Sequence, residues 1–65
     1  MTRTELTERE AQILELLLEG KADKEIAASF DISVRTVRFH VSNIFKKKNL
    51  RTRAELMARE LRRRV

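Results

Sequence analysis

The sequence predicts an all-α fold built from four short helices. It contains no Pro and a single Gly, and it is rich in Leu, Ala, Glu, Lys and Arg, which lose little side-chain freedom in a helix. Its apolar residues recur at helical spacing, and two Ser/Thr-x-x-Glu patterns mark helix starts. Because 65 residues leave room for only one small core, we expect residues 1–65 to form a single domain.

The first helix is expected over residues 7–19. It starts at Thr7-Glu8-Arg9-Glu10, a capping box in which the Thr hydroxyl and the last Glu carboxylate each accept a hydrogen bond from a free backbone N–H. Gly20 can adopt the left-handed conformation that ends a helix. The apolar face of this helix consists of Ala11, Ile13, Leu14, Leu17 and Leu18.

The second helix is expected over residues 23–30, with Ile26, Ala27 and Phe30 buried. Ala22 stands where a Ser or Thr cap is usual, so Asp23 either replaces the cap or leaves this end frayed. Asp31 tolerates a positive φ, which predicts a tight turn through residues 31–33.

The third helix is expected over residues 33–48, between Ser33 as its N-cap and Asn49 as a left-handed terminator. At 100° per residue this helix has two distinct faces. One face is apolar and should pack: Val34, Val37, Val41, Ile44 and Phe45. The other face should be presented to solvent: Arg35, Arg38, Phe39, Ser42 and Lys46.

The fourth helix is expected over residues 52–64, opened by a second capping box at Thr52-Arg53-Ala54-Glu55. It carries an apolar stripe, while Leu56 points nearly the other way. Two apolar directions on a terminal helix indicate two partners, and the sequence does not decide which direction faces the core. The stripe consists of Ala54, Met57, Ala58, Leu61 and Val65.

The charge is unevenly distributed along the chain. The net charge is +5, but residues 1–20 carry two basic and five acidic side chains, so the positive charge lies in the later segments. Such a distribution indicates a polyanionic partner. With no Cys and a lone His40, the sequence predicts no disulfide, metal site or cofactor, and it has no motif for catalysis. No apolar run is long enough to span a membrane, so we expect a cytoplasmic protein.

A short helix, a three-residue turn and a longer helix with a basic outer face together predict a helix-turn-helix. Ala27 is small enough to let the two helices cross closely, and Ile32 and Val37 would fill the space between them. In such a unit the second helix enters the major groove of DNA. Arg35 and Arg38 lie one turn apart there, where a guanidinium can donate two hydrogen bonds to guanine.

One pattern runs through nearly the whole chain: Leu6-Thr7-Glu8-Arg9-Glu10, Leu14, Gly20, Lys24-Glu25-Ile26-Ala27, Ser33, Thr36-Val37, His40-Val41, Asn43-Ile44 and Arg53-Ala54-Glu55-Leu56. Over residues 5–58 this pattern resembles the LuxR/FixJ/GerE-type helix-turn-helix of bacterial transcription regulators. The promoter-reading region of sigma factors shares the first three helices and is the alternative. The segment from His40 to Ile44 and the fourth helix are similar to the LuxR type.

The resemblance implies three sets of functional residues. Those facing base edges are Arg35, Arg38, Phe39 and Ser42, and those facing phosphates are Lys24, Thr36, Asn43, Lys46 and Lys47. The family dimerises through its fourth helix, here Ala54, Met57, Ala58 and Leu61. A two-fold dimer predicts half-sites ~10 bp apart on double-stranded DNA. RNA polymerase and an attached receiver or ligand-sensing domain are further expected partners, so the chain is either a single-domain regulator or an effector piece of a longer one.

Lys48 departs from the family pattern, because a core Leu or Met is usual at its position. We expect it to extend into solvent at the helix end or to loosen the packing there. Phe39 is an aromatic residue between arginines, which favours contact with a thymine methyl over a chance exposed side chain. The run Arg62-Arg63-Arg64 either complements the helix dipole or contacts DNA. A helical protein-interaction module is the second class of function, and it predicts no salt-dependent DNA affinity.

Overall fold

The computed structural model describes residues 5–63 and confirms the all-α class. Its four helices are α1 (Glu8–Leu18), α2 (Asp23–Phe30), α3 (Val34–Lys48) and α4 (Arg53–Arg63), and the described residues contain no strand. The expected helices are all present. Their bounds differ by one residue where a cap lies just outside the helix, and Arg64 and Val65 fall outside the described residues.

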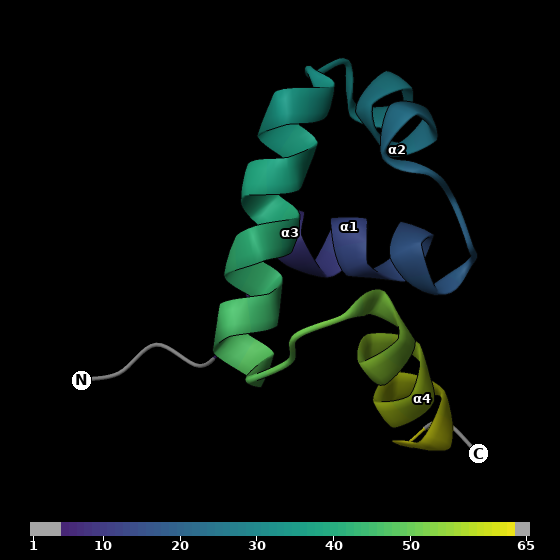
Figure 1. Ribbon diagram of the computed structural model, residues 1–65. Coiled ribbons are helices and arrows are strands. Elements are labelled where there is room, and N and C mark those ends of the chain that lie inside the picture. Colours follow the sequence, from purple (N-terminus) through teal and green to yellow (C-terminus); the bar gives the residue numbers. More distant parts are fainter. Residues whose placement is uncertain (1–4, 64–65) are drawn as a thin grey trace.

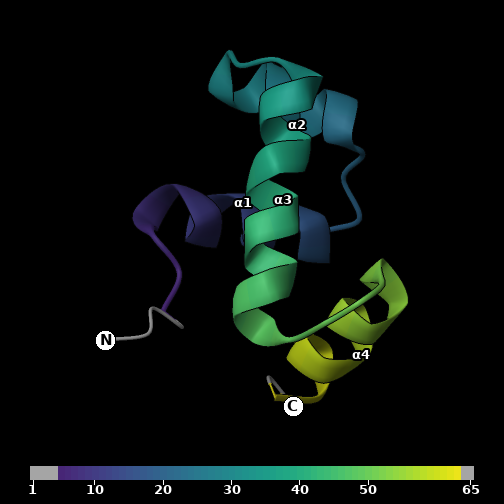
Figure 2. The same ribbon diagram turned by 60° about the vertical axis from the view of Figure 1, so that its left-hand side comes forward.

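Helix α3 is the longest element, and α1 and α2 pack along it, whereas α4 packs mainly against α1 (Figure 1). Helix α1 crosses behind its middle, α2 lies beside its first turns and α4 lies near its last turn. The view turned by 60° gives the same arrangement (Figure 2). The closest packing joins α3 to α2 and to α1, so α3 has one covered side and one open side.

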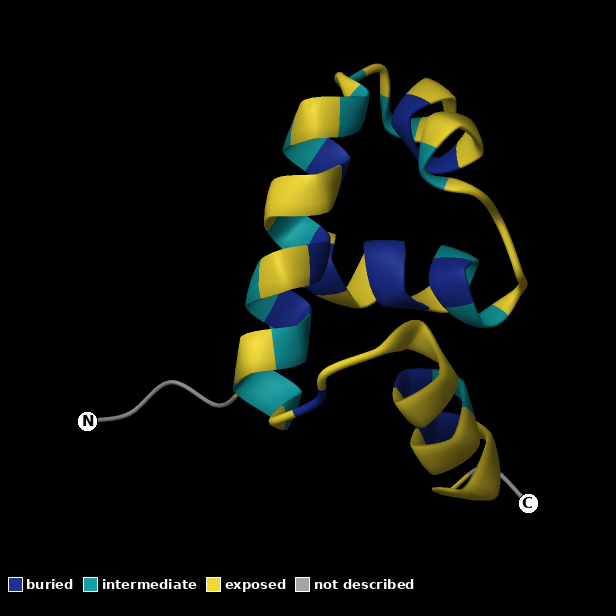
Figure 3. Ribbon diagram, in the orientation of Figure 1, coloured by how far each residue is buried: buried dark blue, intermediate teal, exposed yellow. Residues whose placement is uncertain are grey.

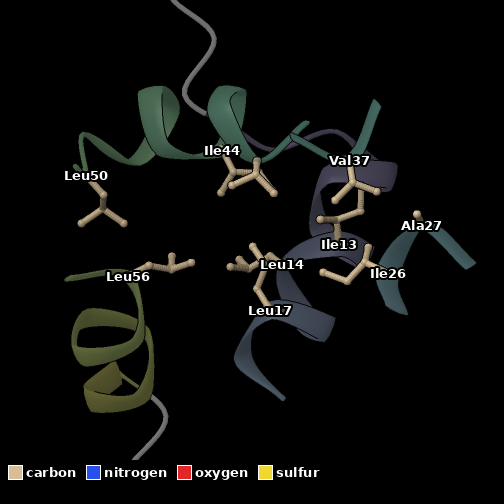
Figure 4. Packing of buried hydrophobic residues seen from close by; sticks show 10 residues of the cluster. Ile13, Leu14, Leu17, Ile26, Ala27, Val37, Ile44, Leu50 and Leu56 are labelled. Carbon is tan, nitrogen blue, oxygen red and sulfur yellow. The ribbon is translucent and has the colours of Figure 1, made fainter. Parts of the chain in front are cut away.

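The hydrophobic core lies between α1 and α3 (Figure 4). Its fully buried side chains come from all four helices, and they are Ile13, Ile26, Val37, Ile44 and Leu56. Leu56 of α4 points toward Leu14 and Leu17 of α1, which closes the core at that end (Figure 4). The expectation that Ala11 belongs to the apolar face of α1 is wrong: Ala11 is exposed, and Glu10 is buried beside it.

Three helices end in the same way, at a residue with left-handed backbone conformation. Gly20, Asp31 and Asn49 have φ values of +86°, +54° and +57°, which confirms the three terminators predicted from the sequence. At each end the next amide donates to the carbonyl five residues back, as from Ile32 to Ala27 at 3.0 Å. These paired bonds satisfy carbonyls that the helix itself leaves without donors.

Two of the predicted helix starts are confirmed. At α1 the Glu10 N–H donates to the Thr7 hydroxyl at 3.2 Å, and the Thr7 N–H donates to the Glu10 carboxylate at 2.9 Å. At α3 the Ser33 hydroxyl accepts from the Thr36 N–H at 3.0 Å. Both caps satisfy amides of the first turn, so they fix where α1 and α3 begin.

The capping box predicted for α4 forms only in part. The Glu55 N–H donates to the Thr52 hydroxyl at 3.1 Å, as expected. The Glu55 carboxylate accepts from the Arg51 N–H at 3.1 Å rather than from Thr52. The long Glu side chain reaches one residue farther back, so the reciprocal half of the predicted box is wrong.

Two ion pairs attach the last turn of α3 to its neighbours. The Lys47 ammonium lies 2.6 Å from the Glu10 carboxylate of α1, and the Lys48 ammonium lies 3.0 Å from the Glu60 carboxylate of α4. The expectation that Lys48 reaches solvent is wrong, because its side chain is only 18% exposed. The Arg59 guanidinium also donates to the Lys48 carbonyl at 2.7 Å. Electrostatic contacts therefore join α4 to α3 at the position where the family pattern has a core Leu or Met.

The Glu10 carboxyl is under two opposing influences. Its burial alone raises the pKa, but hydrogen bonds from Lys47 and Thr7, together with the charge of Lys47, lower it. The net result is a pKa below the ordinary value of 4.5. The ionised form of Glu10 therefore stabilises the fold above pH 4.5, and this contribution is lost as the pH falls through the lowered pKa.

Replacing Glu10 with Gln should lower the free energy of unfolding at pH 7 by about 1–2 kcal/mol, because it removes the carboxylate charge that accepts a hydrogen bond from the mostly buried Lys47 ammonium. It should also flatten the loss of stability below pH 4.5. Urea unfolding at a series of pH values measures both effects. Glu8→Gln is the matched control, since it removes an exposed carboxylate from the same first turn. Equal pH profiles for the two variants would contradict the assignment.

Replacing Lys48 with Met should lower the free energy of unfolding by about 1–3 kcal/mol, because it leaves the Glu60 carboxylate, in a residue 7% exposed, without its close partner. Arg63, at 3.7 Å and well exposed, compensates little. The double variant Lys48→Met/Glu60→Leu should recover most of the loss, because an apolar pair replaces a buried ionic one. Chemical denaturation measures the free energy of unfolding of both variants. A double variant less stable than Lys48→Met would count against this account.

Candidate nucleic-acid interface

Helices α2 and α3 form the helix-turn-helix unit that the sequence predicts. The turn of residues 31–33 reverses the chain at the left-handed Asp31, and Ser33 caps α3 directly after it. Ala27 is buried on α2, and Val37 is fully buried on the facing side of α3. A small residue at this crossing lets the helices approach closely, so the unit fixes the direction of α3.

The outer side of α3 is open along its whole length (Figure 3). The residues expected to read bases all lie on it and are exposed: Arg35, Arg38, Phe39 and Ser42. Phe39 is 64% exposed, and the Arg38 side chain is 74% exposed. The opposite side of the same helix carries Val37, Val41 and Ile44 in the core. Helical periodicity alone therefore separates this surface, which we call the reading face, from the packing side.

The residues expected to contact phosphates have less uniform surroundings. Lys24 on α2 and Lys46 on α3 are exposed, whereas Asn43 and Thr36 are half-buried. The Thr36 hydroxyl shares a 2.9 Å hydrogen bond with the Ser33 hydroxyl. Lys47 is bound to the Glu10 carboxylate and is mostly buried. Of the three consecutive lysines that end α3, Lys46 is thus the one whose side chain is exposed.

Asp23 has a different position from the one expected. It is the first residue of α2 rather than its cap, and the cap position belongs to Ala22. The Glu25 carboxylate accepts from the Ala22 N–H at 2.9 Å, which secures this helix end without Asp23. The Asp23 carboxylate instead contacts two guanidinium groups, those of Arg38 and Arg53.

This contact was missed in the sequence because its partners lie 15 and 30 positions away. The one local signal was the absence of a capping side chain at Ala22, together with Glu25 three residues later. That pattern allows Glu25 to secure the helix end, which leaves Asp23 available for another contact.

His40 lies at the edge of the reading face. It is half-buried, its ring meets the Phe39 ring edge-on at a centroid distance of 5.8 Å, and its Nδ1 atom has no hydrogen-bond partner within residues 5–63. Among residues 5–63, no group of three His, Cys, Asp or Glu side chains could hold a metal ion. None of the helices over the same residues is both long and apolar enough to cross a bilayer.

The structure shows which of the two apolar sides of α4 faces the core. Leu56 is fully buried and faces the core, so the stripe on the other side faces outward. Ala54, Ala58 and Leu61 are exposed, Leu61 to 47%, and Met57 is half-buried. We call these four residues the α4 stripe. Val65, which the sequence also places on this side of the helix, lies outside the described residues.

Comparison with known proteins shows which family shares this architecture. A model of the family described as bacterial regulatory proteins, luxR family, matches residues 4–59. The spore germination protein GerE of Bacillus subtilis (strain 168) is 42% identical over 57 residues, which cover 88% of this chain and 77% of GerE. The response regulator protein VraR of Staphylococcus aureus (strain NCTC 8325 / PS 47) is 44% identical over 50 residues, which cover 77% of this chain and 24% of VraR.

A third relative is the probable transcriptional regulator ycf29 of Cyanophora paradoxa, 47% identical over 51 residues that cover 78% of this chain and 24% of ycf29. The chain thus spans only about a quarter of two of these relatives. The family match includes most of α4, which decides against the sigma-factor alternative. The chain belongs to the luxR family of bacterial regulatory proteins, and it is a helix-turn-helix DNA-binding domain of a transcription regulator rather than an enzyme.

Proposed function

We propose that this domain recognises a specific sequence of double-stranded DNA by placing α3 in the major groove. The observation that carries the proposal is the reading face: four side chains with base-recognition chemistry, exposed together on a helix whose other side is in the core. The major groove admits an α-helix, and it presents a different pattern of donors and acceptors for each base pair. Arg35 and Arg38 suit guanine, Phe39 suits a thymine methyl, and Ser42 accepts or donates.

Phosphate contacts would hold α3 in register. Lys24 lies in the first turn of α2, directly after Asp23, and Lys46 lies in the last turn of α3, so the two exposed cations come from different helices. Thr36 and Asn43 complete the proposed set within α3 itself. Lys47 would join them only by exchanging Glu10 for a phosphate. Such contacts carry affinity for all sequences and position the protein without reading bases.

Replacing Arg38 with Ala should weaken binding to the preferred site by ~1–3 kcal/mol and relax the preference at one base pair. Lys46→Ala is the matched variant, since it removes an equal charge from the same helix face. It should weaken binding to every duplex and reduce the salt slope by about one. Selection from random duplexes followed by salt titrations separates the two effects. Unchanged preference in Arg38→Ala, or a sequence-dependent loss in Lys46→Ala, would contradict these roles.

We also propose that two copies associate through the α4 stripe. Three of its four residues are exposed although Leu56 on the same helix already packs in the core, and the small Ala54 and Ala58 allow a second helix to approach. A two-fold dimer would present two reading faces to successive major grooves, which predicts half-sites ~10 bp apart.

Replacing Leu61 with Glu should abolish the dimer while leaving the fold intact. Leu61 is 47% exposed, so we expect a change in unfolding free energy within about 0.5 kcal/mol. Sedimentation, with and without a duplex carrying two half-sites, measures the association. Leu56→Ala is the contrasting variant, because it removes a fully buried side chain and should cost about 2–5 kcal/mol. A Leu61→Glu protein that dimerises as before would exclude this interface.

A further inference from the structure

The Asp23 carboxylate lies where three helices meet. From the first residue of α2, its Oδ2 atom lies 3.5 Å from the Nε atom of Arg38 in the second turn of α3. Its Oδ1 atom accepts from the Arg53 guanidinium at the start of α4. The Asp23 side chain is 21% exposed and the Arg38 side chain is 74% exposed, so the anchored end of this contact is Asp23.

We propose that Asp23 is a positioning residue that directs Arg38 toward its base, an inference that rests on the proposed reading role of Arg38. A guanidinium has five N–H donors, and the 3.5 Å ion pair brings the Nε side of the Arg38 group, rather than its terminal amino groups, next to the carboxylate. The terminal amino groups remain available for the O6 and N7 atoms of a guanine. Arg is a long side chain with many rotamers, so holding it beforehand reduces the conformational freedom that it loses on binding.

Arg53 makes this arrangement compatible with DNA. A carboxylate beside the reading face would repel nearby phosphates, and the Arg53 guanidinium on its other oxygen offsets that charge. Arg53 also holds the carboxylate from the side of α4, so Asp23 is restrained from two directions. The direction of Arg38 thus depends on the start of the helix that carries the α4 stripe.

This role has a signature that a merely structural residue would not produce. While Arg38 is bound to Asp23, it is less available for phosphates of unrelated sequences. Removing the Asp23 charge should therefore leave binding to unrelated duplexes equal or stronger, because one negative charge near the phosphates is lost. The discrimination between base pairs should fall at the same time. Loss of a structural contact alone would weaken binding to preferred and unrelated duplexes together.

The test compares Asp23→Asn with the unmodified full chain on three kinds of duplex: the site recovered by selection, the same site changed at the base pair that Arg38→Ala relaxes, and an unrelated sequence. The expected result is a roughly fivefold to tenfold loss of discrimination at that base pair. Asp31→Asn is the matched control. It removes an equal charge near the same helices, and Asn suits its left-handed backbone. It should leave discrimination unchanged.

A double-variant cycle shows whether Asp23 acts through Arg38. In the Arg38→Ala background, Asp23→Asn should cause no further loss of discrimination. With Arg38 present, Asp23→Glu keeps the carboxylate and should therefore retain part of the discrimination that Asp23→Asn loses. Urea unfolding of each variant shows whether the variant is folded under the conditions of the binding measurements.

Two results would overturn the positioning role alone: full discrimination in Asp23→Asn, or an equal loss of discrimination with and without Arg38. If Arg38→Ala itself leaves the preference at every base pair unchanged, the reading role of Arg38 fails, and the role of Asp23 fails with it. The single variant Arg38→Ala therefore distinguishes failure of the proposed function from failure of this inference.

Discussion

The packing of α1 against α3 is the contact on which the other features of this domain depend. Ile13 on α1 and Val37 and Ile44 on α3 are fully buried, and they hold α3 by one side along most of its length. A chain of 65 residues without Cys has no disulfide to reinforce so small a core. The packing side of α3 therefore has to be almost entirely apolar. The polar side chains of α3 are consequently gathered on its other side, where they are available to a ligand.

Charged side chains also connect α3 to the other three helices. Glu10 and Glu60 are both buried, and each pairs with a lysine from the last turn of α3. Asp23 connects the second turn of α3 with α2 and α4. The Glu10 and Asp23 contacts reinforce helices that already pack closely on α3, whereas the Lys48–Glu60 pair joins α3 to α4, which pack little against each other. The orientation of α4 relative to α3 therefore rests on the Lys48–Glu60 ion pair and on the hydrogen bond from Arg59 to the Lys48 carbonyl, as well as on Leu56.

The sequence predicted the features that depend on nearby residues. The caps at Thr7 and Ser33 and the terminators at Gly20, Asp31 and Asn49 each involve atoms within five residues, so local rules sufficed. The two sides of α3 followed from helical periodicity. The contacts of Lys47, Lys48 and Asp23 were not predicted, because their partners are 37, 12 and up to 30 residues away. Periodicity places a charged residue on a side of its helix, but it does not identify the charge on another helix that it meets.

The three left-handed residues that end helices restrict the length of the turns between the helices. The connections between its helices are only three or four residues long, and each contains one residue whose positive φ sets the direction of the next helix. An inserted or deleted residue in these turns would shift α3 relative to its supports, so the turns tolerate little variation in length. The exposed side chains of α3, by contrast, contribute little to the core. Under the proposed reading role, substitution at these positions offers a route to new DNA specificities on an unchanged backbone.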